Sequence, residues 1–194
     1  MLRQVLFVQG AGDGVHDHWD NQLVDCLGSE LGPHYDIHYP VMPNEADPKY
    51  VGWKQTLERE LAALEPGAAV IGHSVGGTIL INVLAERTPQ SSLAAICLIS
   101  APFIGAGGWE SGDIEPRPDL AARVPKDVPI FLYHGLDDDT VPVAHVELYA
   151  RALPDAHVRR LANHDHQLNN DLTEVASDIR QLRNGVEGFP GRRR

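Results

Sequence analysis

The sequence predicts a three-layer α/β fold, in which helices cover both faces of a mostly parallel sheet. Short apolar runs alternate with longer amphipathic stretches, and a Gly- or Pro-marked turn separates most neighbours. Most of the apolar runs are unbroken, as is typical of strands that are covered on both faces. We therefore expect about six strands in the order 2-1-3-4-5-6, joined by right-handed crossovers.

The elements follow from this pattern in chain order. Strands are predicted at Gln4–Val8, Tyr35–Tyr39, Ala68–Ile71, Ala94–Ile99, Ile130–Tyr133 and His157–Leu161. Helices are predicted at Trp19–Leu31, Tyr50–Leu64, Val75–Glu86, Val143–Leu153 and Leu172–Leu182. In the second helix, Trp53, Leu57 and Leu61 fall on one face because four residues separate each from the next.

The connection between residues 101 and 128 is rich in Gly and Pro and is unusually long for a compact domain. Such a loop usually contributes to function, and this one has room for only a turn or two of helix. The chain has 194 residues and a mass of 21.2 kDa, which suits one domain. We expect that domain to span residues 1–184, with a flexible tail at residues 185–194.

The composition argues against several classes of partner. The chain is 43% hydrophobic and 22% charged, which excludes wholesale disorder. Its net charge of −11 repels phosphate, so we expect neither a nucleic-acid nor a membrane partner. The first residues lack the long apolar stretch of a secretory signal, and no apolar run is long enough to span a bilayer. Cys26 and Cys97 lie in helical and apolar patterns typical of buried free thiols, which favours a cytoplasmic location.

The sharpest motif is Gly72-His73-Ser74-Val75-Gly76, which lies between a predicted strand and a predicted helix. A serine at so sharp a turn adopts a strained backbone conformation, and glycines two residues away relieve the crowding around it. The turn lifts the hydroxyl above the sheet edge, and the first N–H groups of the helix point towards the site. The motif therefore indicates that Ser74 is a nucleophile.

A serine nucleophile needs a histidine base that is held by a carboxylate, and two later loops offer both groups. Asp137, Asp138 and Asp139 follow the fifth predicted strand, whereas His164 and His166 follow the sixth. Both loops leave the carboxyl ends of strands, the edge at which doubly wound sheets place their sites. Position alone leaves the choice among the three aspartates and between the two histidines open.

With these motifs the chain resembles the α/β-hydrolases, and among them the compact esterases that include the retinoblastoma-binding-protein-nine group. The likeness runs from Leu6 to the last predicted helix. Its most specific parts are the G-H-S-V-G-G elbow, a G-x-x-D-x-x-V-P pattern and a late D-H-x-L. In the second pattern the acid stands three residues before Val141. The resemblance therefore implies a Ser74–Asp138–His166 triad, which needs no cofactor and no metal ion.

The tetrahedral intermediate of acyl transfer carries an oxyanion, which backbone N–H donors stabilise by about 3–4 kcal/mol each. One donor is expected to be the amide of Val75, beside the nucleophile. The resemblance places the second at Ala11, in a loop where Gln9 replaces the histidine of many family members. The residues expected to line the substrate pocket are His16, Trp19, Phe103, Ile104 and Trp109.

We therefore expect a serine hydrolase that cleaves small-molecule esters with short acyl chains through an acyl-enzyme. The alternative is a non-catalytic protein-interaction module on the same scaffold, although all three residues of the implied triad are present. Gly10-x-Gly12-x-Gly14 resembles a dinucleotide fingerprint, but its third glycine falls one residue early. Ten histidines suggest a metal site, but neither a Cys pair nor an H-E-x-x-H motif accompanies them.

Overall fold

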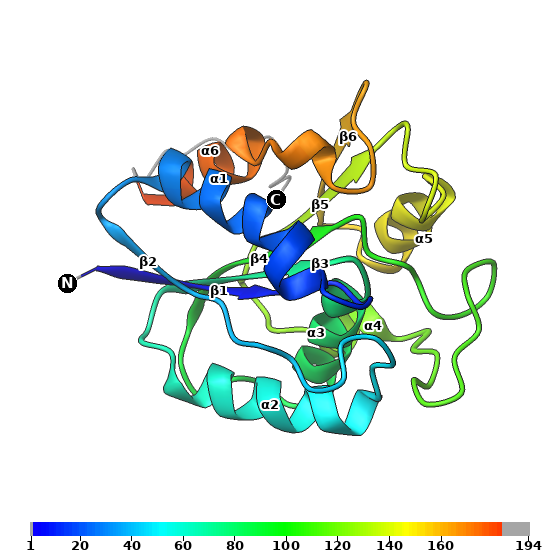
Figure 1. Cartoon of the computed structure of the whole chain (residues 1–194). Coiled ribbons are helices and arrows are strands. Elements are labelled where there is room, and N and C mark those ends of the chain that lie inside the picture. The colour runs from blue at the N-terminus through cyan, green and yellow to red at the C-terminus, as the bar shows by residue number, and fades with distance from the viewer. Residues whose placement is uncertain (1, 184–194) are drawn as a thin grey trace.

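The computed structural model describes residues 2–183, which form a six-stranded sheet in the order β2-β1-β3-β4-β5-β6 (Figure 1). Every pair of neighbouring strands is parallel. The predicted fold class and strand order are confirmed, and the tail expected at residues 185–194 lies outside the described residues. The strands are β1 (Arg3–Val8), β2 (Tyr35–His38), β3 (Ala68–His73), β4 (Leu93–Ile99), β5 (Ile130–Gly135) and β6 (His157–Leu161).

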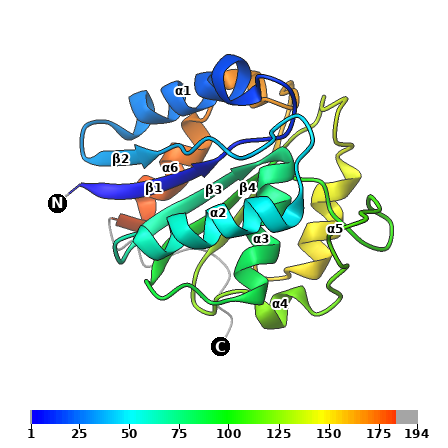
Figure 2. The ribbon, with the colours of Figure 1, turned by 60° about the horizontal axis from the view of Figure 1, so that its bottom comes forward.

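Helices cover both faces of the sheet, so that the described chain has three layers (Figure 1). On one face lie α1 (Asn21–Leu31) and α6 (Thr173–Arg183). On the other lie α2 (Tyr50–Ala63), α3 (Ser74–Glu86) and α5 (Ala144–Ala152), which Figure 2 shows in front of the sheet. Within residues 2–183 no helix is both long enough and apolar enough to cross a bilayer.

Alternate residues of a central strand belong to different cores. In β1, Leu6 and Val8 pack in the cluster that includes the apolar side chains of α2 and α3. Val5 and Phe7 pack instead in the cluster that includes those of α1 and α6, and all four residues are fully buried. Both faces of the strand therefore need apolar side chains, which is why the strand sequences do not alternate.

The long connection after β4 contains little regular structure. Its single helical turn is α4 (Leu120–Arg123). The guanidinium of Arg117 ties the connection to α3, because it donates to the Asn82 side chain at 3.0 Å and to the carboxylate of Glu86. The connection therefore packs against α3 and, through Asp113, against the start of α2 rather than forming a separate layer.

The segment before α1 differs from the prediction in its geometry. A π-helical turn at His16–Asp20 leads directly into α1, so helical structure begins earlier than the predicted start at Trp19. The side chain of Asp20, at the end of this turn, is completely buried. A carboxylate without access to water must find its donors inside the protein. The donors to Asp20 include the backbone N–H of Gly10 and the ring of His73.

Candidate active site

Ser74 occupies the turn between β3 and α3 and has a backbone φ of 51°. This left-handed conformation is costly for a residue with a Cβ and persists only where the surrounding structure imposes it. The strand and the helix come very close here, since a Cβ at Gly72 would lie 2.5 Å from the Cα of Gly77. The elbow predicted from the motif is therefore present, with Ser74 at its tip.

Three side chains from three different loops meet beside this turn. Nε2 of His166 lies 3.0 Å from the hydroxyl oxygen of Ser74. Nδ1 of the same ring lies 2.8 Å from Oδ2 of Asp138. One imidazole thus lies between a hydroxyl and a carboxylate, which is the geometry that general-base activation of a serine requires.

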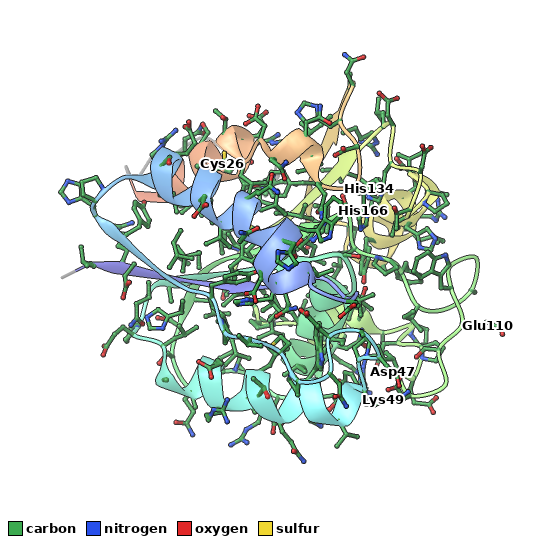
Figure 3. The ribbon with its side chains drawn as sticks, in the orientation of Figure 1. Cys26, Asp47, Lys49, Glu110, His134 and His166 are labelled. Carbon is green, nitrogen blue, oxygen red and sulfur yellow. The ribbon has the colours of Figure 1, made fainter. Side chains whose placement is uncertain are left out.

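The carboxylate of Asp138 is fully buried and is fixed from several sides. Its Oδ1 accepts hydrogen bonds from the backbone N–H groups of Thr140, at 2.9 Å, and Val141, at 2.7 Å. Its Oδ2 faces His166 and also lies 3.3 Å from Nε2 of His134; Figure 3 shows the two histidines side by side. Burial opposes ionisation, but the hydrogen bonds from His166 and the two amides hold the pKa of Asp138 below its usual value. The carboxylate of Asp138 is therefore charged and oriented.

The neighbours of Asp138 point elsewhere. Asp137 and Asp139 are exposed, whereas Asp138 turns inwards towards His166. The backbone N–H of Asp137 donates to the carbonyl oxygen of His164 at 3.0 Å, which joins the loop after β5 to the loop after β6. A Cβ at Gly135 would lie 2.2 Å from that same oxygen, so the glycine permits the contact. This contact places the loops of Asp138 and His166 beside each other.

The two candidate histidines are separated by the shape of their loop. Asn163 has a φ of 59°, so the segment is not extended and the two side chains need not share a direction. Nδ1 of His164 lies 2.8 Å from the carbonyl oxygen of Ala162, in its own loop. His166, and not His164, therefore reaches Ser74.

The loop after β1 is fixed by Glu45. The carboxylate of Glu45 accepts hydrogen bonds from the backbone N–H groups of Gly14, at 2.8 Å, and His16, at 3.0 Å. Its carbonyl oxygen accepts another from Gly12 at 2.7 Å. Desolvation opposes the charge, but these bonds and one from Gln9 hold the pKa of Glu45 below its usual value. An ionised side chain thus holds the loop that contains Ala11.

The N–H groups of the two expected oxyanion donors have no partner among the described residues. Val75 is the second residue of α3, and the first N–H groups of a helix have no partner within it. Ala11 follows Gly10, whose backbone lies against Ser74, since a Cβ at Gly10 would lie 3.2 Å from the Cβ of Ser74. Within residues 2–183 the N–H of Ala11 forms no hydrogen bond, although those of Gly10 and Gly12 do.

A cavity of about 180 Å³ lies between the starts of α2 and α3 and the connection after β4. Val75, the residue after Ser74, lines it, and the expected pocket residues Ile104 and Trp109 line it from the connection. Ile79 extends the apolar wall from α3. The structure therefore brings together two of the five predicted pocket residues.

The other three predicted pocket residues do not line this cavity. Phe103 packs edge-on against Tyr149, with ring centroids 5.0 Å apart. His16 stacks on Tyr39 at 4.1 Å. The side chain of Trp19 is 56% exposed, on the π-helical turn before α1.

Three of the histidines that suggested a metal site have partners within the protein. Nδ1 of His16 lies 2.6 Å from the carboxylate of Asp17, and His164 contacts Ala162. His166 is held between Ser74 and Asp138. In the described part of the chain, no group of three or more His, Cys, Asp or Glu side chains is arranged to hold an ion.

Sequence reasoning missed three buried polar residues at the site: Asp20, His73 and His134. His73 carries a signal, because it lies inside the elbow motif. Asp20 carries none, because its partner His73 is 53 residues away and no spacing rule joins them. His134 directly follows the predicted strand at Ile130–Tyr133, because the apolar run ends at Tyr133.

The comparisons with known proteins agree with this fold. A family model described as "Alpha/beta hydrolase family" matches residues 5–186. The chain belongs to the alpha/beta hydrolase family. No curated protein sequence matches the chain.

Among solved structures, this alpha/beta hydrolase is similar to the ydeN gene product from B. subtilis, with a TM-score of 0.74. The two sequences are 18% identical, and the match covers 94% of this chain and 99% of that one. It is also similar to the CarC serine hydrolase involved in carbazole degradation, with a TM-score of 0.71 and 14% identity over 94% and 91% of the two chains. For Est1E from Butyrivibrio proteoclasticus the TM-score is 0.68, with 13% identity over 94% and 87%. At such low identities the likeness shows the fold alone.

Proposed function

We propose that the protein is a carboxylic ester hydrolase in which Ser74 is the nucleophile, His166 the general base and Asp138 the acid that orients the base. The single observation that supports this most strongly is the continuous chain of hydrogen bonds through these residues, at 2.8 Å and 3.0 Å. It starts from a buried, ionised carboxylate and ends on a serine whose backbone is strained at an elbow.

The first half of the reaction forms an acyl-enzyme. His166 takes the proton from the hydroxyl of Ser74 while the oxygen attacks the carbonyl carbon of the ester. Asp138 stabilises the imidazolium that results, and the amides of Ala11 and Val75 donate to the oxyanion. The tetrahedral intermediate collapses, and His166 gives the proton to the departing alcohol.

The second half restores the enzyme. Water enters where the alcohol stood and loses a proton to His166 as it attacks the acyl carbon. The second tetrahedral intermediate expels the oxygen of Ser74, which recovers its proton from His166, and the carboxylic acid leaves. Each proton transfer passes through the same imidazole, so the proposed reaction uses no cofactor and no metal ion.

The cavity beside Val75 supports small esters with short acyl chains as substrates. Its volume of about 180 Å³ corresponds to roughly six water-sized groups at about 30 Å³ each. Ile79, Ile104 and Trp109 make its wall apolar enough to bind methylene groups. We propose acyl chains of about two to six carbons, since a longer chain would extend beyond this space.

A fluorophosphonate probe, which reacts with activated serines, tests the proposal. We expect it to label the wild-type protein at Ser74 and not to label Ser74→Ala, with the two proteins equally folded by circular dichroism. Turnover of p-nitrophenyl butyrate should disappear in the same variant. A folded wild-type protein that neither reacts with the probe nor hydrolyses the ester would favour the non-catalytic interaction module instead.

The remaining features support a cytoplasmic enzyme with a small-molecule substrate. Cys26 and Cys97 are both free thiols, and burial raises the pKa of Cys97 to about 12, which makes it unreactive. The net charge of −11 disfavours nucleic acids and anionic membranes as partners. We also propose that the chain is a compact esterase similar to the retinoblastoma-binding-protein-nine group, with residues 1–184 as one domain.

A further inference from the structure

A second pair of histidine and aspartate lies beside the nucleophile. His73 directly precedes Ser74, and its Nδ1 lies 2.9 Å from Oδ2 of Asp20. The side chain of His73 is 2% exposed and that of Asp20 is 0% exposed. The proposed mechanism does not use either side chain. Burying a charged pair costs free energy, so the role of this one needs an explanation.

The partners of His73 fix its charge. Its Nε2 lies 3.1 Å from the backbone carbonyl oxygen of His166, and its Nδ1 faces the carboxylate of Asp20. A carbonyl oxygen and an ionised carboxylate can only accept hydrogen bonds, so both ring nitrogens of His73 must donate. A histidine that donates from both nitrogens is an imidazolium cation.

The electrostatics agree with this assignment. Burial opposes both charges, but the attraction of Asp20 and the two hydrogen bonds raise the pKa of His73 above its usual value. Burial likewise opposes the charge of Asp20, but His73 and the hydrogen bonds to the carboxylate lower the pKa of Asp20. The pair is therefore charged on both sides.

The pair joins three loops of the proposed site. Oδ2 of Asp20 also accepts a hydrogen bond from the backbone N–H of Gly10 at 2.7 Å, in the loop that leads to Ala11. Nε2 of Gln167 lies 3.4 Å from Oδ1 of Asp20, in the loop that carries His166. The third loop is the elbow itself, which contains His73. Apart from Asp20, no described side chain hydrogen-bonds to both the loop of the base and the loop of the oxyanion donor.

We propose that His73 and Asp20 are positioning residues, a buried charged pair that fixes the backbone of His166 and the loop of Ala11 relative to Ser74. This inference rests on the proposed function, because it concerns the base and the oxyanion donor of that reaction. The anchored carbonyl oxygen belongs to His166 itself, so a shift of this backbone would move the base directly. Misplacing a catalytic group by about 1 Å can cost about a hundredfold in rate.

Two substitutions of His73 separate its two hydrogen bonds. The amide nitrogen of asparagine can take the place of Nδ1, so His73→Asn keeps a donor for Asp20 and loses the donor for the carbonyl of His166. The longer side chain of glutamine places its nitrogen near Nε2, so His73→Gln keeps the donor for that carbonyl. We expect kcat with p-nitrophenyl butyrate to fall about a hundredfold in His73→Asn at little change in KM. His73→Gln should recover about tenfold of this loss.

Asp178→Asn is the matched control for Asp20→Asn. Asp178 is also a buried carboxylate with a cationic partner, but it accepts hydrogen bonds from Arg159 and Tyr133 rather than from the site. Both variants should lower the urea midpoint of unfolding, whereas only Asp20→Asn should lower kcat of the folded protein. Equal kcat in His73→Asn and His73→Gln, or wild-type kcat in Asp20→Asn, would reduce the pair to a structural role and overturn the proposal.

Nuclear magnetic resonance of the ¹⁵N-labelled protein tests the pair without turnover. In the wild type, His73 should show protons on both ring nitrogens at neutral pH, and a downfield proton should report the bond from Nδ1 of His166 to Asp138. His73→Asn should broaden or remove the His166 signal, and His73→Gln should retain it. A neutral His73 ring, or an unchanged His166 signal in His73→Asn, would overturn the inference even if the protein proved inactive. Absence of probe labelling with the expected spectra would instead overturn only the proposed reaction.

Discussion

Gly76 lies directly against the carbonyl oxygen of Gln9, so that a Cβ at position 76 would lie 2.0 Å from this oxygen. The second glycine of the elbow therefore makes room for the loop after β1. The motif alone suggested a different reason, namely crowding around Ser74 itself. The close approach brings the loop that contains Ala11 to the start of α3, which contains Val75.

Replacing this glycine should disturb the loop without touching Ser74, His166 or Asp138. Gly76→Ala forces a Cβ into the carbonyl oxygen of Gln9, so we expect unfolding to become easier by about 1–3 kcal/mol. The activity should also fall, because the loop that contains the proposed oxyanion donor Ala11 moves. Urea unfolding and kcat with p-nitrophenyl butyrate measure both effects. Gly112→Ala is the control, since a Cβ there has no atom within 4 Å; equal behaviour of the two variants would contradict the steric argument.

The acid can be tested against its neighbours in the same loop. Asp138→Asn should lower kcat by about 10⁴-fold, because the amide holds the His166 ring in the wrong tautomer. Asp137→Asn and Asp139→Asn replace exposed carboxylates and should leave kcat within about threefold of the wild type. Steady-state kinetics of the three variants measures these changes in kcat. If Asp137→Asn or Asp139→Asn lowered kcat the most, the role of the acid would pass to that aspartate.

The fold was predictable because the apolar pattern reports burial on both faces of the central strands. The C-terminal ends of β3 and β5 were not predictable in this way. β3 continues two residues beyond the predicted end at Ile71, and β5 continues two residues beyond Tyr133. Those extra residues include His73 and His134, since the strands become polar where they enter the site. The apolar pattern therefore ends at the residues of these strands that contribute to the site.

The site was predictable to the extent that its chemistry is local in sequence. The elbow surrounds Ser74, and the patterns around Asp138 and His166 are equally short. The pair of Asp20 and His73 left no such trace, because a buried ion pair depends on two segments that meet only in the folded chain. The same holds for Glu45, which contacts the loop after β1 from the segment between β2 and α2.

Glu45 offers a test of that loop which leaves the proposed triad intact. Glu45→Gln replaces an acceptor oxygen with an NH₂ group that faces N–H donors, so the loop of Ala11 should loosen. We expect kcat to fall about tenfold while KM stays nearly constant, as for a loss of transition-state stabilisation. A boronic acid inhibitor, which mimics the tetrahedral intermediate, should bind about tenfold more weakly. Asp13→Asn, an exposed change in the same loop, serves as the control. An equal fall in kcat there would show that the lost negative charge, and not the lost hydrogen bonds of Glu45, causes the effect.

The size of the cavity sets an expected limit on the acyl chain. Across p-nitrophenyl esters, kcat/KM should rise by about fourfold per methylene, from roughly 0.8 kcal/mol each, and level off by about six carbons. Ile104→Ala should enlarge the cavity and move this limit to longer chains, because Ile104 lines its wall. A rate that rises steadily to twelve carbons in the wild type would show a deep channel and contradict the prediction.

The choice between the two histidines has the sharpest expected outcome. His166 contacts both Ser74 and Asp138, whereas the described hydrogen bond of the His164 ring goes to its own loop. His166→Ala should therefore lower kcat at least a thousandfold, which is about 4 kcal/mol in the barrier, because no other imidazole in residues 2–183 hydrogen-bonds to the hydroxyl of Ser74. His164→Ala should lower it by about tenfold at most, since only loop packing changes. Measuring kcat of both variants with one activated ester decides the matter, because the reverse pattern would transfer the role of base to His164.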